Sequence, residues 1–275
     1  MAHPDIKLIL SDIDGTMLPY GHPQVSARTI AAMHAAMDAG IHVGPASGRG
    51  ISHVAPAFGG DEWCIATALG TNGMQVYLDG QLIHEERLPL EALEQVVAVV
   101  RTRDDAGAIV FDDEGLPHLI CGPREELAKT FPVYAREAID DDGLPEKPPV
   151  KLNVFVSGGL ESTRDVMELL QREVKGLDFN LPMAGFINLT PPGYSKASGI
   201  DYLAEALGIG LDQVVVFGDG GNDVEMLAHV PNGVAVEGSA PEAVKAANWH
   251  IGRCEDDAVA AAIEAIVAGE WPFTK

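Results

Sequence analysis

The sequence predicts an α/β protein in which a doubly wound parallel sheet is interrupted by an inserted α+β domain. Short apolar runs, such as residues 8–10 and 214–217, alternate with amphipathic helical segments, which is typical of parallel strands buried between helices. Between these parts, helices mix with strands of alternating polarity, which favours a small antiparallel sheet. We therefore expect a core made of residues 1–81 and 189–275, with residues 82–188 inserted.

The first part of the core is expected to begin with a strand, a helix and a second strand. Ser26 is placed to cap a helix that runs to about Ala39, and Gly40 follows as a stop signal. The pair Asp79-Gly80 between two apolar segments predicts a two-residue β-hairpin. The strands expected here are residues 6–10, 41–44, 64–68, 74–78 and 81–84.

The helices and strands of the insert and of the last part of the core are predicted from the same periodicities. Apolar residues at helical spacing predict helices around residues 93–100, 166–174, 200–207 and 259–267. Residues 137–149 are acidic and rich in proline, which indicates a loop, whereas residues 150–156 alternate like a half-buried strand. The other strands expected are residues 108–111, 116–120, 177–181, 185–190, 214–217 and 234–236, the last of them closing the sheet.

Composition narrows the possible partners. The 275 residues contain 18 Lys and Arg against 41 Asp and Glu, which gives a formal net charge of −23. Such a surface repels phosphate backbones and anionic membranes, so neither nucleic acid nor a membrane is expected as a partner. A small anionic substrate remains compatible, because a metal ion and a few local cations can reverse the field inside a pocket.

Cysteine and histidine usage sets further expectations. Cys64, Cys121 and Cys254 are odd in number and far apart, which indicates reduced thiols in a cytoplasmic protein. The nine His lack closely spaced pairs, so no zinc site is expected. The first residues lack the pattern of a signal peptide, and no apolar run approaches the length of a membrane span.

The segment most suggestive of chemistry is Asp12-Ile13-Asp14-Gly15-Thr16, directly after the first apolar strand. In an open α/β sheet the ligand crevice lies at the carboxyl ends of the strands, so both carboxylates are expected there. Carboxylates this close repel one another unless a cation or a proton lies between them. The alternatives are a calcium-type acidic turn or a simple loop, although Gly15 comes too early for an EF-hand.

Three more polar clusters follow apolar strands or precede a helix: Ser47-Gly48, Lys196, and Asp219 with Asn222 and Asp223. Taken singly, Ser47 is more often a turn hydroxyl, Lys196 a solvated charge and Asp219 a helix cap. Neighbouring strand ends converge, however, so the four clusters are expected to meet in one crevice. Several carboxylates with one Lys would hold a hard cation next to an anion, and Mg²⁺ suits such a site.

With these motifs in place, the sequence resembles the haloacid dehalogenase superfamily of phosphatases, and within it the Cof-type branch. The segment Asp12-Ile13-Asp14-Gly15-Thr16-Met17-Leu18 is similar to the first motif of that family, and Ala46-Ser47-Gly48-Arg49 to the second. Lys196 fits the third motif and residues 218–223 fit the fourth. The resemblance implies a Rossmann-like core, and the long insert before Lys196 resembles the C2-type cap of this branch. Ser47 departs from the commoner Thr but keeps the hydroxyl.

The resemblance also implies roles for these residues. Asp12 would be the nucleophile that forms an aspartyl-phosphate, and Asp14 would act as general acid and then general base. Lys196 would be catalytic and would bind phosphate together with the backbone at Ile13, Ser47-Gly48 and Asn222. Mg²⁺ would be held by Asp12, Asp14 and Asp219, with Asp223 as a further metal residue or as the group that orients Lys196.

The expected function is hydrolysis of a small phosphomonoester, such as a sugar phosphate or a similar metabolite. A phosphomutase of the same fold is an alternative, because Asp14 could return the phosphoryl group instead of activating water. A phospho-acceptor or a metal-dependent binding protein is a third reading, although receiver domains are much shorter. Selectivity between substrates is expected to lie in the insert.

Overall fold

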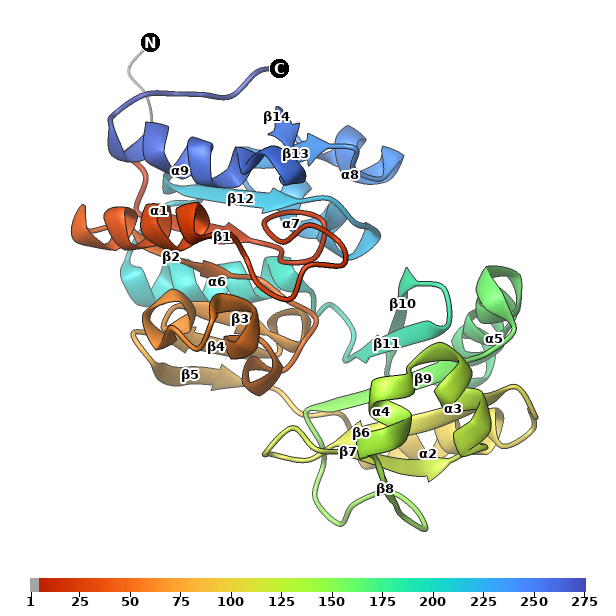
Figure 1. Ribbon diagram of the computed structural model, residues 1–275. Helices are drawn as coiled ribbons and strands as arrows, with labels where there is room; N and C mark the ends of the chain where they lie inside the picture. The colour runs from red at the N-terminus through yellow and green to blue at the C-terminus, as the bar shows by residue number, and fades with distance from the viewer. Residues whose placement is uncertain (1–4) are drawn as a thin grey trace. The chain divides into compact units, whose positions relative to one another are not determined.

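The computed structural model describes residues 5–275, and its central element is a five-stranded parallel sheet (Figure 1). The strand order is β14-β13-β12-β1-β2, with Leu8 of β1 opposite His42 of β2 on one side and Val214 of β12 on the other. This order confirms the predicted doubly wound core. The strands are β1 (Leu8–Ser11), β2 (His42–Pro45), β12 (Val214–Gly218), β13 (Asn232–Glu237) and β14 (Trp249–Arg253). The last of these was not predicted.

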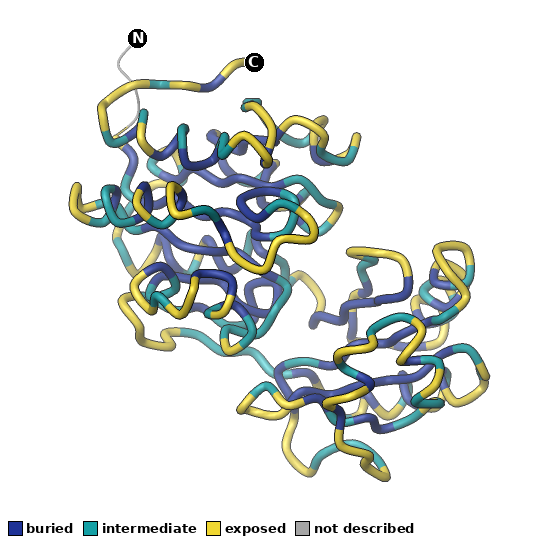
Figure 2. Tube along the Cα trace, in the orientation of Figure 1, coloured by how far each residue is buried: buried dark blue, intermediate teal, exposed yellow. Residues whose placement is uncertain are grey.

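Helices cover both faces of this sheet, and β1, β2, β12 and β13 are largely buried, whereas β14 is partly exposed (Figure 2). Because side chains alternate along a strand, Ile9 packs on one face and Leu8 and Leu10 pack on the other. The first face is covered by α1 (Ala27–Asp38) and α9 (Ala258–Val267). The second is covered by α6 (Lys196–Leu207), α7 (Val224–His229) and α8 (Pro241–Ala246).

A small antiparallel sheet of β3 (Ala68–Gly70), β4 (Gln75–Leu78) and β5 (Gln81–Glu85) adjoins the core. The predicted hairpin is confirmed, with positive φ values of 50° and 78° at Asp79 and Gly80. The strand predicted at residues 64–68 is wrong over most of its length. Cys64 instead lies in η3 (Glu62–Ile65), where the Asp61 side chain accepts a hydrogen bond from the Trp63 backbone and starts a 3₁₀ turn.

Residues 86–194 form a second compact unit, and the rest of the chain forms the first. This unit contains a six-stranded sheet in the order β10-β11-β9-β6-β7-β8, antiparallel except between β7 and β8. Its elements are α2 (Leu90–Val100), β6 (Ala106–Phe111), β7 (Pro117–Cys121), α3 (Arg124–Thr130), α4 (Pro132–Glu137), β8 (Ile139–Asp140), β9 (Lys151–Val156), α5 (Gly159–Glu173), β10 (Asp178–Met183) and β11 (Phe186–Thr190).

Residues 151–156 form the predicted strand, β9, but the prediction that this strand is half-buried is wrong, because β9 is buried on both faces. Asn153 and Phe155, on the face expected to be exposed, are 1% and 0% accessible. Phe155 packs against Leu127 of α3 and Ala135 of α4, helices that the sequence did not reveal. The amide nitrogen of Asn153 is satisfied inside the sheet, where Nδ2 donates to Asn188 Oδ1 at 2.6 Å, whereas Oδ1 has no hydrogen-bond partner among residues 5–275. A polar residue in a strand therefore does not by itself indicate a solvent-facing side.

Two predictions from composition can also be compared with the structure. All three cysteines are free thiols, and Cys64 and Cys254 are buried. Across residues 5–275, none of the helices has both the length and the apolar character that a membrane crossing requires.

Candidate active site

The predicted motifs begin at one edge of the parallel sheet, on three neighbouring strands. Asp12 follows β1, Ser47 comes shortly after β2, and Asp219 follows β12. Backbone pairing continues past the strands, since Asp12 N–H donates to Phe217 at 2.9 Å and Ala46 N–H donates to Ser11 at 2.7 Å. The three loops therefore start side by side at the carboxyl ends of β12, β1 and β2, where an α/β sheet places its ligands.

The end of β2 is shaped by Gly44 and Pro45. β2 is the edge strand of the five-stranded sheet, so the missing N–H of Pro45 removes no bond from the sheet. A Cβ added at Gly44 would lie 1.7 Å from the carbonyl oxygen of Thr67. Glycine is required here because the chain before β3 passes directly against this strand. The approach continues beyond the strand, where the Ser47 N–H donates to Leu69 at 2.8 Å.

Lys196 lies at the centre of the candidate site. It is the first residue of α6, its accessibility is 0%, and Ser195 caps the helix before it. Its Nζ donates to Asp12 Oδ1 at 2.5 Å and to Asp223 Oδ1 at 2.6 Å. Burial alone would lower the pKa of Lys196, but the two carboxylates raise it above its usual value. Lys196 is therefore a charged bridge between the first and fourth motifs.

Asp223 is held from both sides. Its Oδ1 accepts from Lys196, and its Oδ2 accepts from the backbone N–H groups of Asp219 and Gly220 at 3.0 and 2.9 Å. The side chain is fully buried. With both oxygens engaged by protein donors, Asp223 is better suited to orienting Lys196 and its own loop than to binding a metal.

Asp12, Asp219 and Asp223 form a carboxylate cluster in which one oxygen of each lies within 4.8 Å of the others. Burial raises the pKa of Asp12 to about 8; Lys196 opposes this effect, while Asp223 and Asp219 add to it. Burial likewise raises the pKa of Asp219 to about 6, although Thr16 donates to its Oδ1 at 2.7 Å. A cation would lower both values, and an all-oxygen donor set suits Mg²⁺.

Asp14 has a partner to which the sequence analysis gave no role. Arg49 Nη2 donates to both carboxylate oxygens of Asp14, at 2.6 and 2.7 Å, and the two side chains are 37% and 43% accessible. The Arg49 N–H also donates to Ser47 Oγ at 3.1 Å. Arg49 thus links the second motif to the first. Its place two residues after Ser47 was the only signal in the sequence.

Tyr20 was also missed. Its hydroxyl donates to Asp219 Oδ2 at 3.4 Å, although the residue is 72% accessible. Partial burial and the nearby carboxylates, Asp219 foremost, raise the pKa of Tyr20 to about 12. The phenol therefore remains a hydrogen-bond donor beside the cluster. No local sequence pattern marks it, because Tyr20 lies in an irregular segment after the first motif.

Apart from Lys196 on α6, the residues predicted to bind phosphate lie in the same three loops. Ile13 follows Asp12 with its side chain buried, Ser47 is 2% accessible, and Asn222 lies in η6 (Gly221–Asp223). A Cβ on Gly48 would lie 3.1 Å from Oδ1 of Asn72, so the absence of a side chain there keeps space beside that amide. Their role in phosphate binding stays a prediction.

The loop between β3 and β4 adds Asn72, another residue the sequence analysis did not select. Asn72 has a φ of 55°, is 4% accessible, and its Oδ1 has no hydrogen-bond partner among residues 5–275. Its N–H donates to the Ser47 carbonyl at 2.9 Å, which places it against the second motif.

Comparison with known sequences decides the family. The haloacid dehalogenase-like hydrolase family matches residues 9–263. The chain belongs to this family. Its similarity extends to the 5-amino-6-(5-phospho-D-ribitylamino)uracil phosphatase YbjI of Escherichia coli strain K12, at 28% identity over 98% of both chains. An HMP-PP phosphatase of Serratia proteamaculans is also 28% identical, over 92% of this chain and 93% of that one.

Solved structures show the same fold. SMU.1108c of Streptococcus mutans superposes with a TM-score of 0.84 at 21% identity, covering 96% of this chain and 99% of that one. The sugar phosphatase BT4131, of subclass IIB, gives a TM-score of 0.78 at 23% identity, covering 94% and 98%. Because the chain belongs to a hydrolase family and its relatives are named as phosphatases, it is an enzyme of the phosphatase type.

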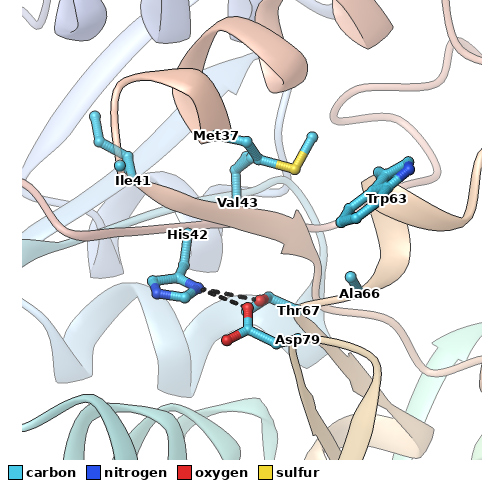
Figure 3. Close-up of a pocket in the computed structure, with 9 residues that line it drawn as sticks. Met37, Ile41, His42, Val43, Trp63, Ala66, Thr67 and Asp79 are labelled. Carbon is cyan, nitrogen blue, oxygen red and sulfur yellow. Dashed lines mark hydrogen bonds and ion pairs between the residues drawn. The ribbon is translucent and has the colours of Figure 1, made fainter.

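A cavity of about 290 Å³ in the core unit lies apart from these motifs (Figure 3). It is at the amino end of β2, where His42 Nδ1 lies 3.4 Å from Asp79 Oδ1. Met37, Trp63 and Thr67 contribute to its walls. None of its lining residues belongs to the loops that follow β1, β2 or β12.

Proposed function

We propose that this chain is a Mg²⁺-dependent phosphatase that hydrolyses small phosphomonoesters through an aspartyl-phosphate on Asp12. The observation that carries the proposal is the buried bridge from Lys196 to Asp12 and Asp223, with Asp219 beside it. A buried Lys between two carboxylates holds a nucleophile and an incoming anion in one place. A structural ion pair would not need a third carboxylate next to it.

Asp12 attacks phosphorus with a carboxylate oxygen, and the bond from phosphorus to the leaving oxygen breaks as the acyl phosphate forms. Lys196, already bonded to Oδ1 of Asp12, orients the carboxylate for this attack. Its charge also faces the phosphate oxygens, which carry the developing negative charge. Water then attacks the phosphorus of the acyl phosphate, releasing inorganic phosphate and restoring Asp12.

Asp14 gives its proton to the leaving alkoxide in the first step and takes one from water in the second. Arg49 contacts both oxygens of Asp14, so it fixes where that carboxyl group lies. When Asp14 is protonated, one of its oxygens becomes a donor and Arg49 keeps the other. Arg49 is therefore a positioning residue for the proton transfer.

The phosphate oxygens are bound by short donors from the three loops. The N–H groups after Asp12, beginning at Ile13, act as a backbone cradle together with Ser47-Gly48, where Ser47 contributes its hydroxyl because its N–H already donates to Leu69. Asn222 contributes an amide from the fourth motif. Ser47 is anchored by backbone hydrogen bonds to Leu69 and Asn72, so this part of the cradle is held by the chain around β3.

The donor set fits Mg²⁺: Asp12 and Asp219 supply carboxylate oxygens, and the Asp14 backbone supplies a carbonyl. The pKa values of Asp12 and Asp219 are raised because both groups are buried and because the carboxylates carry more negative charge than Lys196 neutralises. When bound, Mg²⁺ would offset the repulsion between Asp12 and the phosphate dianion.

The substrate is a sugar phosphate or a similar small metabolite, and residues 86–194 act as a C2-type cap that discriminates between substrates. Two observations support this. Curated relatives are named as phosphatases of small phosphorylated compounds. The second unit has its own sheet and core, so it can vary independently of the catalytic loops.

The test is the release of phosphate from an aryl phosphate and from a panel of sugar phosphates, with Mg²⁺ and with excess chelator. Asp12→Asn is expected to be folded and inactive, because the amide is not nucleophilic. Asp38→Asn, exposed at the end of α1, is the matched control and should retain activity.

Substantial turnover by Asp12→Asn, or full activity in chelator, would refute the mechanism. Activity that depends strictly on a bisphosphate activator would instead identify a phosphomutase. Trapping of phosphorus on the wild-type protein, but not on Asp12→Asn, would support the covalent step directly.

A further inference from the structure

A second group of metal-ligating side chains lies in the core unit, outside the loops of the candidate active site. It consists of His34 on α1, Asp61 at the start of η3, and Cys64 within η3. One donor atom of each, a ring nitrogen, a carboxylate oxygen and the thiol sulfur, lies within 4.8 Å of the other two. The absence of short His spacings in the sequence concealed this group, because its ligands come from two separate elements.

We propose that His34, Asp61 and Cys64 form a binding site for a single borderline-soft divalent ion such as Zn²⁺, separate from the carboxylate site of the phosphatase.

The donor types determine the class of ion. Imidazole nitrogen and thiolate sulfur select zinc and related transition metals, whereas Mg²⁺ and Ca²⁺ require oxygen donors. A neutral imidazole, a carboxylate and a thiolate together carry two negative charges, which balance a divalent cation. Charge balance matters because Cys64 has 0% accessibility and packs within the hydrophobic core of this unit.

The geometry needs only a modest adjustment. His34 Nε2 and Asp61 Oδ2 are 2.7 Å apart, and tetrahedral zinc bonds would place its donor atoms about 3.3–3.6 Å from one another. The pair would open by less than an ångström, and the Cys64 sulfur already lies within 4.8 Å of both residues. His34 can make this movement because its side chain is 42% accessible.

Asp61 is already oriented as a ligand by a second hydrogen bond. Its Oδ1 accepts from the Trp63 N–H at 3.1 Å, which leaves Oδ2 directed at His34. Fixed outer partners of this kind are typical of carboxylate ligands. An ordinary link between α1 and η3 would explain the bond between His34 and Asp61, but it would not require a thiol beside both of them.

An ion can reach the site from solvent. The Asp61 side chain is 27% accessible, so the site opens between α1 and η3. Met37, one turn after His34, and Trp63, between Asp61 and Cys64, both line the cavity shown in Figure 3. Three protein ligands leave the fourth tetrahedral position to water.

Binding replaces a proton with the metal. The buried Cys64 thiol, whose pKa is raised to about 12, loses its proton to solvent as the bond between sulfur and metal forms. No electron is transferred, and His34 binds as the neutral imidazole. The bound ion would connect α1 to η3 and so stabilise the folded core unit.

The experiment uses the full chain and Co²⁺ as a spectroscopic stand-in for Zn²⁺, in excess Mg²⁺ so that the carboxylate site is filled. We expect one Co²⁺ per chain, with an intense near-ultraviolet band from thiolate-to-metal charge transfer that Zn²⁺ abolishes. Cys64→Ser should lose this band, and His34→Gln should weaken binding by more than the tenfold to hundredfold that loss of an outer partner costs. Zn²⁺ should raise the melting temperature of the wild type and not that of either variant.

Cys254→Ser and Asp219→Asn are the controls and should keep the band. Absence of a thiolate band in the wild type, or its persistence in Cys64→Ser, would overturn the proposal. If Cys64→Ser does not fold, His34→Gln decides, because that side chain is partly exposed. Unchanged Co²⁺ affinity in His34→Gln would then reject the site. The result is independent of phosphatase activity.

Discussion

Lys196→Met is the most informative perturbation of the candidate site, because the lysine is fully buried between two carboxylates. Methionine has a similar length but cannot donate to Asp12 or Asp223, which Lys196 contacts at 2.5 and 2.6 Å. Removing one partner of a buried ion pair typically costs about 3–5 kcal/mol of unfolding free energy. For a chain of this size, this corresponds to a fall in melting temperature of about 6–20 °C.

The pH dependence gives this prediction its second readout. The pKa of Asp12 is about 8 in the folded protein against 3.8 for an ordinary aspartate, so the folded state holds this proton more tightly. Stability from this group is therefore present at low pH and is lost as pH rises through about 8. Loss of Lys196 raises the pKa of Asp12 further, so the deficit of the variant should grow as pH rises above about 8 and should be larger at about pH 9.5 than at about pH 5.

The assay is thermal unfolding of wild type and Lys196→Met in chelator at both pH values. Lys245→Met, on the exposed surface of α8, is the matched control and should change the melting temperature little. An unchanged melting temperature in Lys196→Met would refute the buried bridge. An equal deficit at both pH values would refute the electrostatic explanation and leave only a packing effect.

Three further predictions concern the first two motifs and strand β2, which precedes the second motif. Asp14→Asn should lower turnover of an alkyl phosphate about 10²–10⁴-fold, because the leaving alkoxide needs a proton. With a substrate that has a good leaving group, burst kinetics should show a smaller loss in the phosphorylation step. Equal impairment of that step with both substrates would contradict the acid role. Arg49→Gln should lower kcat for alkyl phosphates by up to about 10²-fold, because Asp14 is then misplaced. When Asp14→Asn is already present, adding Arg49→Gln should change kcat little. A full additional loss in this double variant would show that Arg49 has an independent role. Gly44→Ala should lower the free energy of unfolding by about 2 kcal/mol or more, because its Cβ would overlap the Thr67 carbonyl. Gly50→Ala is the control and should change stability little, because the space around Gly50 is open. Equal denaturation midpoints for the two variants would contradict this prediction.

The sequence specified those parts of the fold whose signals are local. The helix that begins after Ser26 was located because a capping side chain and Gly40 lie at its ends, and both act within a few residues. The strands β1 and β12 were recognisable because burial on both faces leaves them almost wholly apolar, with Ser11 as the one polar residue. Positive φ at Asp79 and Gly80 follows directly from the residue types.

Elements that depend on distant partners were missed. β14 carries Trp249, His250 and Arg253, and it is a strand because β13 offers a free edge next to it. The apolar run at residues 64–68 contains both a 3₁₀ turn and the start of β3, and the cap at Asp61 decides between them. Local residue propensity does not predict such elements, because distant partners decide their structure.

The residues of the candidate site fall into the same two groups, those with local sequence signals and those that depend on distant partners. Asp12, Lys196, Asp219 and Asp223 were expected to converge because they follow apolar strands or begin a helix, and the structure brings these four side chains together. Their roles stay a prediction. The link between Arg49 and Asp14 depends on how two side chains point across adjacent loops, which no spacing encodes.

The selectivity of the enzyme should move with residues 86–194. The chain enters this unit at Glu86 and leaves it at Tyr194, whose hydroxyl donates to Glu86 at 2.8 Å, so the two crossings are joined within the unit itself. Lys196 follows the second crossing by only two residues, so a chimera must keep Ser195 and Lys196 intact. Replacing residues 87–193 with the corresponding unit of a family member of different preference should transfer the ranking of substrates, while phosphate release still requires Asp12. The readout is kcat/KM over a panel of sugar phosphates, with an aryl phosphate as a measure of the unaltered chemistry. A folded chimera that keeps the original ranking would assign selectivity to the core, where the Thr71–Gly73 loop next to Ser47 would be the first segment to test.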